Sequence, residues 1–209
     1  LPISSRKAGK IAEALEVALW QATGSGYGGP NGLLNKFKGI KQIISDAGGS
    51  VVNANVTGYY GAGAPITGID TAAKAKAAVL AVIKALPNGV KGKTDVRIFC
   101  GWDSFDLLIQ AYIDANLYHY NPGTDKSNPN AEFIVPGTSY KVVPVHGLTG
   151  TSDIYAFRMS NIFIGVDLQG EEEKFEMWYS QDDRNVKFSA SFKLGVQFAY
   201  MDEVTKFEA

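Results

Sequence analysis

The sequence predicts an α+β fold, with helices concentrated in the first half of the chain and strands in the second. Apolar residues recur at helical spacing in residues 6–23, 33–46, 71–86 and 104–117. From residue 140 onward, short apolar or alternating runs bounded by turn residues are typical of strands. Because the two kinds of element are segregated along the chain, we expect an α+β arrangement.

The first helix is expected at residues 6–23. Ser4 or Ser5 would cap its start, and Gly24 would end it. The apolar stripe that would face the core consists of Ile11, Leu15, Ala18, Leu19 and Ala22.

Two glycine-rich segments flank the second expected helix. Residues 24–32 should form a loop by composition, and the helix should follow at 33–46. Residues 47–69 are expected to be a loop that contains one short strand at 51–56. The apolar face of the helix would be formed by Leu33, Phe37, Ile40 and Ile44.

A third helix is expected at residues 71–86, with Asp70 as its N-cap. A buried strand at 96–100 and a fourth helix at 104–117 should follow it. The buried face of the third helix would consist of Val79, Leu80, Val82, Ile83 and Leu86, and its solvent face of Lys74, Lys76 and Lys84.

The C-terminal region is expected to be rich in strands after a polar loop at 121–139. Apolar residues alternate with lysines and serines in 186–194, which predicts a strand with one buried and one solvent-facing side. Gly195 is expected to interrupt this strand and to bend it. The expected strands are 140–145, 154–159, 162–166, 175–179, 186–194 and 196–200.

Composition and charge narrow the classes of function. The 209 residues include 20 Lys and Arg against 21 Asp and Glu, so no general attraction to nucleic acid or to an anionic membrane is expected. No apolar run reaches the roughly 18 residues of a membrane span. The single cysteine, Cys100, lies in the strand expected at 96–100 and is interpreted as an unreactive core residue.

No motif in the sequence indicates a catalytic, cofactor-binding or metal site. Residues 24–29 fit the G-x-G-x-x-G pattern, but a dinucleotide site requires a strand before the pattern, whereas a helix precedes it here. His119 and His146 lack metal-ligand spacing, and no G-x-S-x-G nucleophile elbow is present. A Ser-His-Asp catalytic triad whose members are brought together only by the fold would leave no such sequence motif. The glutamates at 171–173 are interpreted as a charged turn, and we predict no cofactor and no enzymatic activity.

Several segments, in the order found here, resemble parts of tailed-bacteriophage major capsid proteins with the Hong Kong 97-type fold. Residues 10–34 resemble the long spine helix, the loop and the next helix, and residues 96–108 resemble a strand followed by a helix. The resemblance implies that residues 1–209 form one capsid-type subunit core. Its peripheral part would include the spine helix, about 1–47, and parts of the C-terminal sheet, and its axial part would lie largely within 48–185. The closing strands of the family are matched by residues 142–148, 159–167 and 186–204.

The resemblance also implies a structural shell subunit that assembles with copies of itself into the pentamers and hexamers of an icosahedral head. Scaffold, portal and decoration proteins would be further partners, DNA would be enclosed without sequence readout, and no membrane would be involved. The subunit would be made in the cytoplasm of a bacterial host and would reside in the virion. A nanocompartment shell of the encapsulin type has a similar fold and is a close variant. Contacts between subunits are expected in the loops 47–69 and 121–139 and in the turn 169–173.

The chain departs from the family at its start. Members usually carry an N-terminal arm and an extended hairpin loop before the spine helix, whereas this chain begins almost at that helix. Leu1 is therefore expected to mark a fragment, a truncation or a processed chain. An alternative from another class is a monomeric α+β enzyme or small-ligand-binding module that uses the glycine-rich loops. Particles or capsomer-sized rings would indicate the shell, and a full-length monomer with a tightly bound small molecule would indicate the alternative.

Overall fold

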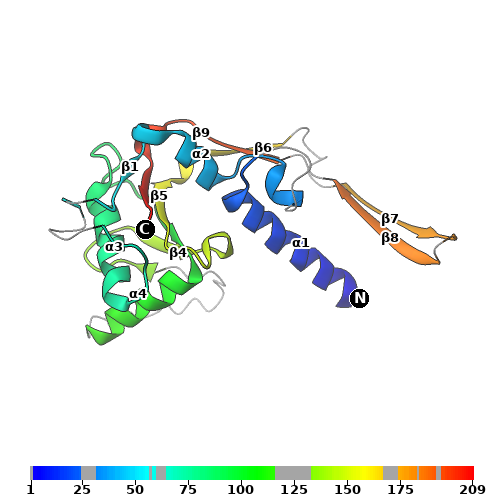
Figure 1. Ribbon diagram of the computed structural model, residues 1–209, viewed down its shortest axis with the longest axis horizontal. Helices are drawn as coiled ribbons and strands as arrows, with labels where there is room; N and C mark the ends of the chain where they lie inside the picture. Colours follow the sequence, from blue (N-terminus) through cyan, green and yellow to red (C-terminus); the bar gives the residue numbers. More distant parts are fainter. Residues whose placement is uncertain are drawn as a thin grey trace.

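The body of the molecule is a mixed β-sheet with helices packed on both of its faces (Figure 1). A computed structural model describes residues 2–24, 32–56, 58–59, 65–115, 133–166, 174–182, 184–191 and 194–209. The strands of the sheet lie side by side in the order β1 (Val52–Asn53), β10 (Thr205–Phe207), β5 (Ile154–Arg158), β2 (Val96–Cys100), β4 (Lys141–Pro144) and β3 (Phe133–Ile134). Together with the helices they confirm the α+β fold class predicted from the sequence.

Alternation along the central strand β5 divides the core into two clusters. Ile154 and Ala156 face one cluster, whereas Tyr155 and Phe157 face the other. All four side chains are buried, so β5 is covered on both faces. β5 runs antiparallel to its two neighbours, β2 and β10, while β2 pairs with β4 in parallel.

The helices α3 (Ala72–Ala85) and α4 (Trp102–Asp114) cover the first cluster. Thr71, rather than the predicted Asp70, caps α3, because its side chain accepts a hydrogen bond from the Lys74 backbone N–H at 3.4 Å. Asp70 instead pairs with the Lys74 ammonium group at 2.7 Å. The predicted buried face of α3 is only partly correct. Alanines and valines pack against the sheet, and Leu80 lies on the exposed side.

The second cluster is covered by the C-terminal end of α1 (Pro2–Gln21) and by α2 (Ile40–Asp46). α1 begins at Pro2, before the predicted caps, because proline lacks an N–H that the first helical turn would leave unpaired. The helix predicted at 33–46 is wrong as one element. A 3-10 turn (Gly32–Asn35) precedes α2, which starts only at Ile40.

Gly39 explains the late start of α2. Its N–H donates to the Ala22 carbonyl at 2.7 Å, and a Cβ at this position would lie 2.8 Å from the Ala22 nitrogen. The chain therefore passes too close to the end of α1 for any larger residue, and the helix begins just beyond this contact.

Two further pairs of strands lie outside the central sheet. β6 (Ile162–Val166) pairs with β9 (Leu194–Phe198), and β7 (Lys174–Ser180) pairs with β8 (Asn185–Ser191), both antiparallel. The strands expected at 186–194 and 196–200 are therefore only partly correct, because residues 185–191 pair with β7 and residues 194–198 pair with β6. Gly195 does not interrupt a strand. It lies within β9, where it pairs with Gly165 of β6.

Other elements predicted from the sequence agree with the structure only in part. β2 and β6 match the predicted ranges, and α4 starts two residues earlier than predicted, after Gly101. The loop predicted at 121–139 contains β3, and its residues 121–132 lie outside the described residues. His119, most of the glycine pattern at 24–29 and the turn at 169–173 also lie outside the described residues.

Candidate assembly surface

The C-terminal end of α1 is anchored in the body through Trp20. This side chain is buried against an aromatic group, with ring centroids 5.3 Å from Phe99, 6.2 Å from Tyr155 and 6.4 Å from Phe157. Gly147 lies directly beneath the indole, since a Cβ there would come within 2.4 Å of Trp20 Cδ1. The glycine therefore makes room for the ring that holds α1 in place.

Two polar contacts complete the anchor. The Glu16 carboxylate accepts a hydrogen bond from the His146 backbone N–H at 2.8 Å, and Gln21 Nε2 donates to the Gly147 carbonyl at 2.7 Å. Further toward the N-terminus, residues 9–14 are exposed except for the half-buried Ile11. α1 thus projects from the body, with only its last turns embedded (Figure 1).

The β7–β8 hairpin extends away from the body at the same end of the molecule as the start of α1 (Figure 1). Its register places Tyr179 opposite Val186, so these two side chains lie on one face, together with Met177 two residues along β7. The exposed fractions of Met177, Tyr179 and Val186 are 69%, 59% and 52%. The apolar face predicted by the alternation therefore exists but is not covered within the subunit.

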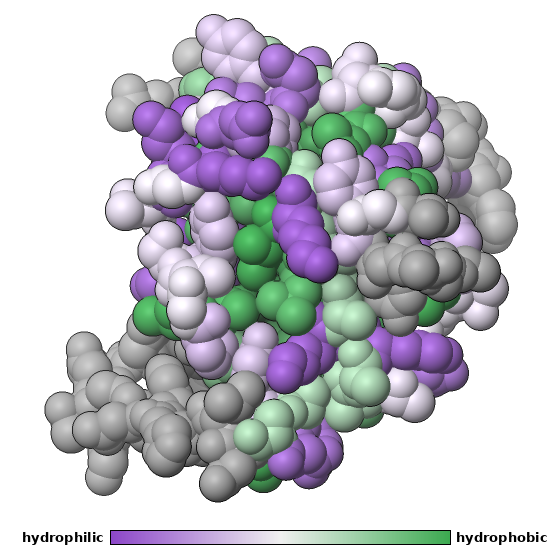
Figure 2. Space-filling model, turned by 90° about the vertical axis from the view of Figure 1, so that its left-hand side faces the viewer, coloured by the Kyte–Doolittle hydropathy of each residue, from purple (hydrophilic) through white to green (hydrophobic). Residues whose placement is uncertain are grey.

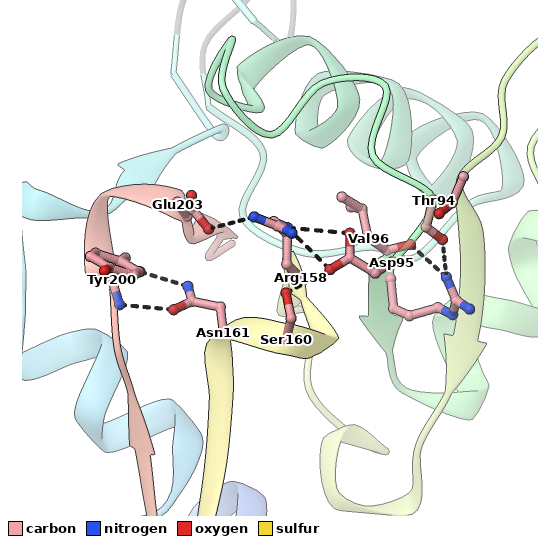
Figure 3. Close-up of polar contacts among 9 residues, drawn as sticks. Thr94, Asp95, Val96, Arg158, Ser160, Asn161, Tyr200 and Glu203 are labelled. Atoms are coloured by element: carbon pink, nitrogen blue, oxygen red, sulfur yellow. Dashed lines mark hydrogen bonds and ion pairs between the residues drawn. The ribbon is translucent and has the colours of Figure 1, made fainter.

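An arginine-centred cluster joins the ends of three sheet strands beside the β6–β9 ribbon (Figure 3). Arg158, at the end of β5, donates to the Asp95 carboxylate at 3.1 Å and lies 3.7 Å from the Glu203 carboxylate. Ser160 Oγ donates to the same Asp95 carboxylate at 2.7 Å. The Ser160 bond and then the Arg158 bond lower the pKa of Asp95 below its usual value.

Asn161 fixes the point where the chain leaves the body for β6. Its Nδ2 donates to the Tyr200 carbonyl at 2.7 Å, and the Tyr200 N–H donates back to Asn161 Oδ1 at 2.8 Å (Figure 3). Because Asn161 precedes β6 and Tyr200 follows β9, the buried Asn161 side chain clamps both strands of the ribbon at their exit from the body.

Comparison with solved structures identifies this arrangement. A chain of the procapsid of satellite phage P4, solved with its size determination (Sid) protein, superposes on 99% of this chain with a TM-score of 0.63 and 12% identity. A chain of the native GTA particle capsid gives a TM-score of 0.55 at 17% identity, and one of the cyanophage A-1(L) capsid gives 0.55 at 14%. The chain has a phage capsid-type fold. It spans 62%, 65% and 69% of the length of these three proteins, in the same order.

The comparisons confirm the fold implied by the sequence resemblance, and they do so through structure alone. No protein-family model matches the sequence, and no curated protein matches it significantly. At identities between 12% and 17%, the shared feature is the path of the backbone.

A cavity of about 490 Å³, lined by polar and charged residues, lies in this capsid-type fold where α1 and α2 meet the body. The Lys41 ammonium group, which borders it, is already paired with the Asp153 carboxylate. None of its described lining residues comes from the segments 24–32 or 47–69, so it gives no support to a site in the glycine-rich loops. The lining consists of Gln21, Thr23, Lys41, Gln42, Ser45, Thr151, Asp153 and Glu208.

The residues considered for chemistry do not converge on a site in the described part of the chain. Burial raises the pKa of the Cys100 thiol to about 12, which disfavours the reactive thiolate. The ring of His146 packs 5.7 Å from that of Trp102. Among the described residues, no cluster of His, Cys, Asp and Glu could hold a metal ion, and none of the described helices is long and apolar enough to cross a membrane.

Sequence reasoning missed the contacts that join the strand ends and position the projecting elements. The clamp between Asn161 and Tyr200 spans 39 residues of sequence, and the Arg158–Asp95 contact spans 63. Neither pair has a local spacing that could reveal it. The tight packing of Gly147 under Trp20 likewise follows only from the fold.

Proposed function

We propose that the chain is the shell-forming subunit of a phage-type head and that it acts structurally rather than as an enzyme. The observation that supports this proposal most strongly is that the β7–β8 hairpin presents an uncovered apolar face at the far end of a capsid-type fold. The subunit associates with copies of itself into pentamers and hexamers, which close into an icosahedral shell around DNA.

The physical basis of the proposal is that an isolated two-stranded hairpin is at best marginally stable in water. Covering the exposed parts of Met177, Tyr179 and Val186 in a neighbouring subunit would contribute about 1–2 kcal/mol for each side chain, since 52–69% of each remains to be buried. Such a contact is modest alone, but closed symmetry repeats it around every axis of the shell. The exposed half of α1 offers a second surface at the same end of the molecule.

The division into parts follows the anchors described above. In this proposal the peripheral part comprises α1 with the β6–β9 ribbon and the hairpin, and the axial part comprises the central sheet with α3 and α4. Scaffold, portal and decoration proteins are the further partners. The net charge of −1 suits a wall that encloses DNA without reading its sequence. The location is the virion, after synthesis in the bacterial cytoplasm.

Expression of the complete open reading frame, followed by electron microscopy and light scattering, tests the proposal. Closed particles or rings of capsomer size are expected. DNA within the particles would indicate a head, whereas a protein cargo would indicate a nanocompartment shell. A complete gene product that remains monomeric and binds a small molecule tightly would contradict the structural role.

A further inference from the structure

The two helices that cover one face of the central sheet carry opposite charges. α3 contains Lys74, Lys76 and Lys84 and no acidic residue. α4 contains Asp103, Asp106 and Asp114 and no basic residue. In a chain with almost equal numbers of acidic and basic residues, this face therefore presents a basic helix beside an acidic one.

The same face exposes apolar side chains where the helices meet. Lys76 Nζ lies 5.3 Å from the centroid of the Tyr112 ring, so the N-terminal half of α3 lies near the C-terminal part of α4. Leu80, one turn beyond Lys76, is 37% exposed, and Ile113, next to Tyr112, is 49% exposed. Figure 2 views the end of the body that carries these helices and shows apolar side chains gathered between hydrophilic ones.

Several charges on this face lack an opposite partner. Lys74 pairs with Asp70, and the Asp103 carboxylate accepts a hydrogen bond from the Gly150 N–H at 2.7 Å. The remaining charges form no ion pair with any described residue. They are Lys76 and Lys84 on α3, and Asp106 and Asp114 on α4.

We propose that this α3–α4 surface is an interface with a second copy of the chain, in which α3 of one copy lies against α4 of the other. A uniformly acidic partner would be attracted to α3 and repelled by α4. A uniformly basic partner would be repelled by α3 and attracted to α4. A second copy presents both signs beside exposed apolar side chains, and it therefore complements both helices at once. The inference rests on the proposed self-assembly and names one surface that carries it.

A charge-swap experiment on the purified chain tests the inference. Variant A carries Lys76→Glu and Lys84→Glu, and variant B carries Asp106→Lys and Asp114→Lys. In A alone, an acidic α3 would face an acidic α4. In B alone, both helices would be basic. In a mixture, α3 of A meets α4 of B with opposite charges, and α3 of B meets α4 of A with the wild-type charges.

Sedimentation velocity at low salt measures the association, and thermal unfolding checks that each variant is folded. The expected result is that A and B alone associate about tenfold or more weakly than the wild type and that an equimolar mixture recovers wild-type association. A matched control, Asp202→Lys, reverses an exposed charge away from the two helices and should leave association unchanged.

Two results would overturn the interface. One is wild-type association by A and B separately, and the other is a mixture of folded variants that associates no better than its components. A wild-type chain that stays monomeric at millimolar concentration would overturn it as well. The shell proposal is tested separately, by particles from the complete open reading frame, so particles that persist in A and B would remove this interface and leave the shell intact.

Discussion

Asn161 and Tyr200 exchange two hydrogen bonds at the point where the β6–β9 ribbon leaves the body. Asn161→Ala would remove both hydrogen bonds that the buried Asn161 side chain makes with the Tyr200 backbone. We expect a loss of about 1–3 kcal/mol in the free energy of unfolding, because each hydrogen bond contributes about 0.5–1.5 kcal/mol. Urea unfolding measures the loss. Gln197→Ala, on the exposed side of β9, is the matched control and should change the free energy of unfolding by less than about 0.5 kcal/mol.

The packing of Gly147 beneath Trp20 gives a second prediction. Gly147→Ala would place a Cβ within 2.4 Å of the indole, so α1 should loosen from the body and the protein should unfold at least about 1–3 kcal/mol more readily. In a Trp20→Gly background the same substitution should cost much less, because that background lacks both the ring and the Trp20 Cβ, which would lie 2.7 Å from the new Cβ. Gly89→Ala is the control, since a Cβ there meets nothing within 4 Å. Equal costs for Gly147→Ala in both backgrounds would show that Trp20 is not the reason for the glycine.

The ionic cluster around Arg158 predicts a pH dependence of stability. Hydrogen bonds from Ser160 and Arg158 hold the pKa of Asp95 below its usual value in the folded chain. The ionised carboxylate therefore stabilises the fold above the unfolded pKa, and this contribution is lost as the pH falls through the lower folded pKa. Asp95→Asn should reduce stability at neutral pH and have a progressively smaller effect in strong acid. A difference from the wild type that is the same at all pH values would contradict this role of the charge.

Cys100 should be inert in the native protein. Burial raises the pKa of its thiol to about 12, and alkylating reagents attack the thiolate. Iodoacetamide at mildly alkaline pH should therefore leave the folded chain unmodified and should label it rapidly in urea. Mass spectrometry reads the outcome directly, and fast labelling under native conditions would show that β2 opens to solvent.

The strands that the sequence predicted well are those with sharply bounded apolar runs. β2 and β6 were predicted to the residue, because each is a short apolar run bounded by turn or polar residues. The helix predicted at 33–46 failed for a tertiary reason. The helical spacing there is real, but the close contact of Gly39 with Ala22 delays the start of α2.

The hairpin and α3 show a different limit of sequence reasoning. Alternation predicted that one face of β8 is apolar, and burial within the subunit was inferred from that pattern. The structure leaves this face open, because the pattern reveals the chemistry of a face and not what covers it. Leu80 was assigned to the core for the same reason. The charge difference between α3 and α4 could be read from the sequence, but its meaning depends on the two helices lying side by side.

The most direct test of the central claim compares assembly of the complete gene product with and without the apolar face of the hairpin. In one variant, Met177, Tyr179 and Val186 are all replaced by serine, and in the control Asp182→Ser alters the hairpin turn. Because the three side chains are uncovered in the subunit, we predict an unchanged thermal unfolding of the variant subunit and a loss of particles in electron micrographs. The control should still form particles. Particles of normal size and yield from the triple variant would contradict the claim that this face joins the subunits of a shell.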